Sequence, residues 1–209
     1  MTTMAFKHLV AASAHFHRLV RAQVVVDDGV AHAPTQILAA ARLAGLLMFR
    51  GLRVDCGGLA PGMRVPSEDA CVQGERLLEM LLITLRQLGH PTPRHRLDPH
   101  CASAALARLA FAEIHERLTP AALAYLAQSP MGMTDAAMAA TVATAGLIHD
   151  HAPAMPTHQA AALAALGFEE GLSTVPWPLS AAHAQALCAR RSSPARGAGW
   201  EPAYIRTMS

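Results

Sequence analysis

The sequence has little charge, few aromatic side chains and almost no lysine. Of its 209 residues, 15% are charged and 4% are aromatic, and Lys7 is the one lysine among 17 basic residues. Soluble domains carry about 25% charged residues on average, so this chain has little charge with which to cover its surface. Because 52% of the residues are hydrophobic, an intrinsically disordered protein is excluded. The net charge of +2 also lacks the basic excess that is typical of nucleic-acid binders.

Long apolar runs and closely spaced cysteines are missing as well. A membrane-spanning helix needs about 20 consecutive apolar residues, and the best candidates, 43–49 and 77–85, are much shorter. Histidines interrupt the apolar residues near the N-terminus, which argues against a secretory signal. The four cysteines form no C-x-x-C pair, so we expect reduced thiols in a cytoplasmic protein without membrane association. The 44 alanines and the excess of arginine over lysine are typical of a GC-rich bacterial genome.

What the sequence does have is apolar residues at helical spacing, separated by helix caps. Ser67 is a good N-cap, and Gly89 suits the left-handed position after a helix. Asp98-Pro99 and Thr119-Pro120 each place a cap before a proline, which is favoured at the first helical position. These patterns predict an all-α protein, a compact bundle of about eight helices. The expected helices cover residues 3–23, 34–49, 67–88, 98–118, 119–128, 134–148, 157–168 and 180–191.

The same patterns predict how the chain is organised. We expect one helical domain over residues 1–191, with a polar hinge at 89–98 and a flexible basic C-terminal tail at 192–209. Three valines followed by Asp-Asp-Gly allow a short β-hairpin near residues 23–32. The segment 34–49 is apolar nearly all round, which predicts a central position in the bundle. Because so few charges are left to cover the exterior, we also expect a homo-oligomer, most simply a homodimer.

One short motif points to metal chemistry. His149, Asp150 and His151 follow an apolar helical run. A helix that ends in His-Asp resembles the HD-domain metal phosphohydrolases, which are also all-α. The resemblance implies a divalent metal held by this segment and an upstream histidine, His115 or His100, in a metal-dependent hydrolase. It covers only this segment, and the later aspartate of that family has no counterpart after Asp150. The alternative is a polar helix C-terminus, where histidine interacts favourably with the helix dipole.

The sequence lacks the common catalytic and nucleotide-binding motifs. The sequence contains no G-x-S-x-G elbow, P-loop, H-E-x-x-H or G-x-G-x-x-G motif. Residues 119–146 have the outline of a helix-turn-helix, but the second helix lacks the side chains that read bases, so we expect no nucleic-acid partner. The preferred function is therefore a non-catalytic interaction or structural homo-oligomer, with no cofactor. The alternatives are the metal-dependent hydrolase and a helical bundle that binds a small apolar ligand.

Overall fold

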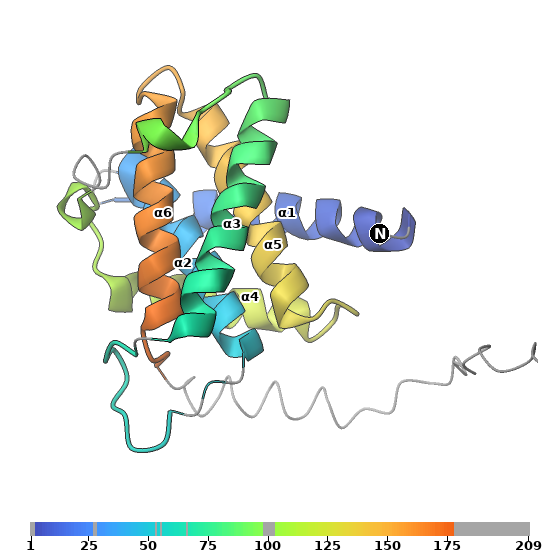
Figure 1. Ribbon diagram of the computed structural model, residues 1–209, viewed down its shortest axis with the longest axis vertical. Helices are drawn as coiled ribbons and strands as arrows, with labels where there is room; N and C mark the ends of the chain where they lie inside the picture. The colour runs from blue at the N-terminus through green and yellow to red at the C-terminus, as the bar shows by residue number, and fades with distance from the viewer. Residues whose placement is uncertain are drawn as a thin grey trace, which may run out of the picture.

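The computed structural model describes residues 3–26, 29–52, 54, 56–65, 67–97 and 103–177, with backbone only at 3–5. This part of the chain is helical, as predicted, and forms one bundle (Figure 1). Among the described residues between the third and fourth α-helices lie two single-turn 3-10 helices, η1 (Arg94–Arg96) and η3 (Ala104–Leu106). The α-helices of the described residues are α1 (Thr3–Gln23), α2 (Ala33–Leu52), α3 (Glu68–Gln87), α4 (Phe111–Leu126), α5 (Met133–Asp150) and α6 (Thr157–Ser173).

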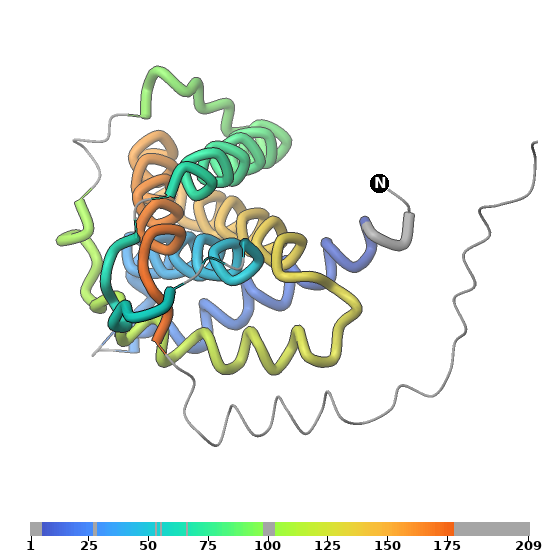
Figure 2. The backbone as a smooth tube through the Cα atoms, turned by 60° about the horizontal axis from the view of Figure 1, so that its bottom comes forward, coloured from blue at the N-terminus to red at the C-terminus, as the bar shows by residue number. Residues whose placement is uncertain are grey.

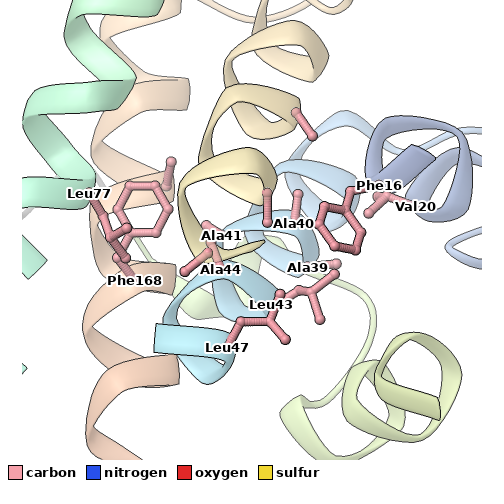
Figure 3. Packing of buried hydrophobic residues seen from close by; sticks show 14 of the residues in the cluster. Phe16, Val20, Ala39, Ala40, Ala41, Leu43, Ala44, Leu47, Leu77 and Phe168 are labelled. Carbon is pink, nitrogen blue, oxygen red and sulfur yellow. The ribbon is translucent and has the colours of Figure 1, made fainter. Parts of the chain in front are cut away.

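Helix α2 is the centre of the bundle, which confirms the position predicted from its sequence. Every residue from Thr35 to Phe49 is buried, and all five other α-helices contact it. Figure 3 shows Phe16 of α1 and Phe168 of α6 packing on opposite sides of this helix. The apolar surface of α2 is therefore covered within one copy of the chain. A second copy is not needed to bury it, so the apolar surface of α2 does not support the predicted homo-oligomer.

Helices α2 and α6 approach each other closely because glycines line their contact. A Cβ atom built on Gly45 would lie 2.5 Å from the carbonyl oxygen of Phe168. On the facing helix, a Cβ atom on Gly171 would lie 2.4 Å from the carbonyl oxygen of Arg42. Such distances leave no room for any side chain, so the two backbones touch directly. Beside this contact, Arg42 and Glu170 form an ion pair of 2.7 Å between the two helices.

The ends of α3 follow the predicted signals. The side chain of Ser67 accepts a hydrogen bond of 3.4 Å from the backbone N–H of Ala70. Gly89, two residues after the last helical residue, has a φ of +86°, which suits glycine because it has no Cβ atom. The serine cap and the glycine stop are thus both confirmed.

The predicted boundary at Thr119-Pro120 is wrong. One helix, α4, runs from Phe111 to Leu126 with Pro120 inside it. It begins where the backbone N–H of Ala110 donates a hydrogen bond of 2.7 Å to the Glu113 carboxylate. The side chains of Leu118 and Leu123 are buried on either side of the proline. Their packing outweighs the one backbone hydrogen bond that a proline removes.

Three further expectations are not confirmed. Residues 98–102, the start of the expected helix 98–118, lie outside the described residues, and η3 and an irregular segment precede α4. The expected helix 180–191 and the tail 192–209 lie outside them too, so the count of about eight helices is not reached. Residues 23–26 and 29–32 form no strands, and the N–H of Gly29 instead closes a turn onto the carbonyl of Val26 at 2.8 Å. No described helix is long and apolar enough to cross a membrane.

Candidate ligand-binding groove

A groove runs along the surface between α3 and α6. The two helices lie side by side in Figure 1, the third in green and the sixth in orange, and α3 runs upward while α6 runs downward. The groove has a volume of about 920 Å³, and its lining also includes Arg64, Val65 and Ser67 before α3 and Arg94 and Leu97 after it. Ligand pockets in proteins are typically about 300–1,000 Å³ in volume. The groove therefore has room for a small molecule.

Small side chains on the facing sides of the two helices leave this room. Gly74 of α3 and Ala165 of α6 stand where larger residues would fill the space. The floor is apolar and includes Phe168 and Leu172, both buried. Val72, on the wall, is 55% exposed, although valine usually prefers the interior. The other apolar lining residues are Val65, Ala70, Leu78, Leu97, Ala162 and Leu166.

Two ion pairs stand at the ends of the groove. Arg64 lies 4.0 Å from Glu169 at one end, and Arg94 binds Glu75 at the other. All four side chains are more than half exposed, so these pairs add little to the stability of the fold. Because each charge already has a partner of the opposite sign, the rim of the groove is close to electrically neutral.

One thiol lies on the groove wall. Cys71 of α3 is exposed and lines the groove, whereas Cys56 is half-buried elsewhere. No histidine is among the lining residues, so within the described part of the chain no imidazole lines the groove beside the thiol to act as a base. Its position makes Cys71 a site for chemical labelling of the groove.

The residues predicted from the His-Asp motif bind three different partners. His149 shares a hydrogen bond of 2.8 Å with His90, between Nδ1 of the first ring and Nε2 of the second. The Asp150 carboxylate accepts from His17 at 2.9 Å and from Arg21 at 3.0 Å, both on α1. These bonds tie the C-terminal end of α5 to α1 and to the loop after α3.

His151 and His115 belong to two further neighbourhoods. Nε2 of His151 lies 2.9 Å from the side-chain oxygen of Gln36, at the start of α2. His115 is buried in α4, with its ring centroid 5.5 Å from that of Trp177. Burial, with a smaller effect of Arg50, lowers the pKa of His115 to about 4. The structure thus does not bring His115 to the His-Asp motif, and His100 lies outside the described residues.

No three metal-ligating side chains converge in the part of the chain that the structure describes. Among the described histidines, cysteines, aspartates and glutamates, no three lie together in a group that could hold a metal ion. Three of the predicted ligands, His149, Asp150 and His151, instead form hydrogen bonds that connect α5 to other parts of the bundle. Their distribution is that of a structural network.

Sequence reasoning did not identify the groove. Its lining comes from segments about 90 residues apart in the chain, and neither helix alone shows that its small residues face those of the other. The available signal was the small side chains of α3, Ala70, Cys71 and Gly74, which interrupt an otherwise large-residue helix. Comparisons of the chain with protein-family models, with curated proteins and with solved structures find no match, so the geometry of the groove alone carries the functional argument.

Proposed function

We propose that this chain is a non-catalytic binding protein that takes a small apolar ligand in the groove between α3 and α6. The observation that carries the proposal is the apolar groove of about 920 Å³ between α3 and α6. Binding sites are typically concave and largely apolar, with a few polar groups that orient the ligand. The groove has this composition, since most of its lining is apolar, including Phe168 and Leu172, and only a few polar side chains line it.

The charges at the rim favour an uncharged ligand. A carboxylate or ammonium group on the ligand would have to displace Glu75 or Glu169, or Arg64 or Arg94, from an existing pair. An uncharged ligand gains the burial of its apolar surface, about 25 cal/mol per Å², without that cost. We therefore expect neutral hydrophobic molecules to bind more tightly than their charged analogues of the same size.

The test is binding of Nile red, a neutral dye that fluoresces in apolar surroundings. Ala165→Phe places a large ring in the groove, and Ala22→Phe makes the same change on the exposed side of α1 as a matched control. We expect one dye per chain for the wild type and for the control. Ala165→Phe should bind the dye at least ~10-fold more weakly, which corresponds to a loss of about 1.4 kcal/mol of binding free energy. Equal binding by all three proteins, or no binding by the wild type, would contradict the proposal.

A second candidate function is self-association through the N-terminal half of α1. Figures 1 and 2 both show this helix extending beyond the rest of the bundle. Phe6 is 57% and Val10 is 48% exposed there, whereas Ala12, Phe16 and Val20 are buried. Two copies of the same apolar ridge can pair about a twofold axis, which is the commonest symmetry of homo-oligomers. Light scattering tests this candidate: a mass of 22.1 kDa for the wild type at micromolar concentration would contradict it, and Phe6→Glu should dissociate a dimer.

A further inference from the structure

A second, much smaller cavity lies between α2 and α4. The guanidinium group of Arg42 binds the Glu170 carboxylate through Nε, at 2.7 Å, and its carbon atom lies 5.2 Å from the centre of the Phe111 ring. One of its terminal nitrogens, Nη1, is buried and has no hydrogen-bond partner. The side chain of Arg42 is only 6% exposed, so bulk water does not satisfy this nitrogen.

Two more buried polar atoms without partners lie beside it. They are Nε2 of His115 and Oγ1 of Thr119, both on α4. The three residues line one small cavity with room of about 10 Å³, which is close to the space that one water molecule needs. Buried polar groups are almost always hydrogen-bonded, so three unpartnered atoms on one cavity indicate that it has an occupant.

The charge around the cavity is positive. Arg42 and Glu170 neutralise each other, and burial keeps His115 uncharged at pH 7 because its pKa is lowered to about 4. Arg50, close enough to contribute to that lowering, donates only a long hydrogen bond of 3.5 Å to the carbonyl of Trp177. No carboxylate of the described residues pairs with it, and its Nε is also buried without a partner. These four side chains, Arg42, Glu170, His115 and Arg50, therefore carry a net charge of +1.

The unpartnered atoms are mostly donors. Nη1 of Arg42 can only donate, the Thr119 hydroxyl can donate, and neutral His115 donates from Nε2 in one of its two tautomers. A monatomic anion accepts from all three groups at once, whereas a water molecule, which accepts two hydrogen bonds, would also donate to the Thr119 oxygen or to Nε2 of His115 in its other tautomer. We propose that this cavity is a binding site for a halide ion, held by Arg42, His115 and Thr119. Larger anions are excluded by the size of the cavity.

Trp177 packs beside the cavity. Its ring centroid lies 5.7 Å from that of Phe111 and 5.5 Å from that of His115, and both of these residues line the cavity. Trp177 in turn packs against Gly62, where a Cβ atom would lie 2.8 Å from the indole ring.

The direct test is a crystal structure of the full chain grown without chloride and soaked in sodium bromide. Bromide scatters anomalously, so its position is unambiguous. We expect an anomalous peak in the cavity within about 3.5 Å of Nη1 of Arg42 and Oγ1 of Thr119. A cavity that holds water, or is empty, in the presence of bromide would overturn the proposal.

A test in solution shows whether the halide also binds outside the crystal, where its concentration is lower than in the soak. A ligand that binds only the folded state raises the midpoint of thermal unfolding, by about 5 °C or more when it exceeds its Kd 100-fold. We expect this rise in sodium chloride relative to sodium gluconate of equal ionic strength, because gluconate is too large for the cavity. Thr119→Val removes the hydroxyl while keeping the shape and should lose the chloride effect, whereas Thr119→Ser keeps it. Equal midpoints for the wild type in the two salts would refute halide binding.

Discussion

Replacing Gly45 with alanine tests the direct backbone contact between α2 and α6. The new methyl group would lie 2.5 Å from the Phe168 carbonyl oxygen, 2.9 Å from the Cα atom of Gly171 and 3.0 Å from the backbone nitrogen of Leu172. Ordinary carbon–oxygen contacts begin at about 3.3 Å, so the helices must separate by nearly 1 Å. All three atoms belong to the backbone and cannot turn aside as a flexible side chain does.

The expected size of the effect follows from two opposing terms. Overpacking of a core costs about 1–3 kcal/mol, and the rigid neighbours of Gly45 place this site near the upper value. Alanine in the middle of a helix gains about 1 kcal/mol over glycine. We therefore expect Gly45→Ala to lower the free energy of unfolding by about 2 kcal/mol, or the midpoint of thermal unfolding by about 4–8 °C.

Gly74→Ala is the matched control. It is also a helical glycine, but its new methyl group would lie 3.5 Å from a Leu172 side-chain carbon, an ordinary van der Waals contact. Here only the helix-propensity gain remains, so this variant should be more stable than the wild type, by up to about 1 kcal/mol. Urea denaturation followed by circular dichroism measures both values. If Gly45→Ala were as stable as Gly74→Ala, the close contact between α2 and α6 would be refuted.

Three further predictions concern buried charge and the groove. Arg42→Met should destabilise the fold by about 3–5 kcal/mol because it leaves Glu170 buried without its partner, and Arg42→Met with Glu170→Leu should recover most of that loss in a double-mutant cycle. The folded-state pKa of His115, about 4, is below its unfolded value of 6.5, so its contribution to stability is complete above pH 6.5 and is lost as the pH falls toward 4. That contribution is at most about 3 kcal/mol, and urea titrations of His115→Phe should lack this part of the pH dependence. Cys71 should react with a maleimide dye faster than Cys56, and a ligand bound in the groove should slow that reaction, as read by mass spectrometry of each cysteine peptide. An unchanged rate with saturating ligand would place the ligand elsewhere.

Capping residues and apolar spacing predicted the helix limits correctly where residues close in sequence determine them. The limits of α1 agree with the expected helix at residues 3–23, and α3 begins after the serine that caps it. The Thr119-Pro120 pair misled because the same two residues open a helix or continue one, depending on what is packed around them. In this chain Leu118 and Ala122 are both fully buried, and this tertiary packing is invisible to a cap rule.

The candidate sites depend even more on tertiary structure. His149, Asp150 and His151 are adjacent in sequence, yet the bundle directs them to α1, α2 and the loop after α3. The groove and the cavity beside Arg42 show the reverse, since distant segments meet to form them. In the sequence, Arg42 is the charged residue just before the apolar run 43–49. Its neighbours in the sequence do not indicate that Glu170 lies beside it in the fold.

The buried position of α2 has a consequence for synthesis of the chain. Its main neighbours, α5 and α6, begin at Met133 and Thr157, which are 100 or more residues after the start of α2 at Ala33. At a translation rate of about 5–20 residues per second, a ribosome needs about 5–20 s to make that intervening chain. During this interval the nascent chain presents an apolar helix without the two helices that cover most of its surface. We expect a chaperone that binds exposed apolar segments to bind this chain during translation. The yield of folded protein should therefore rise when such a chaperone is supplied.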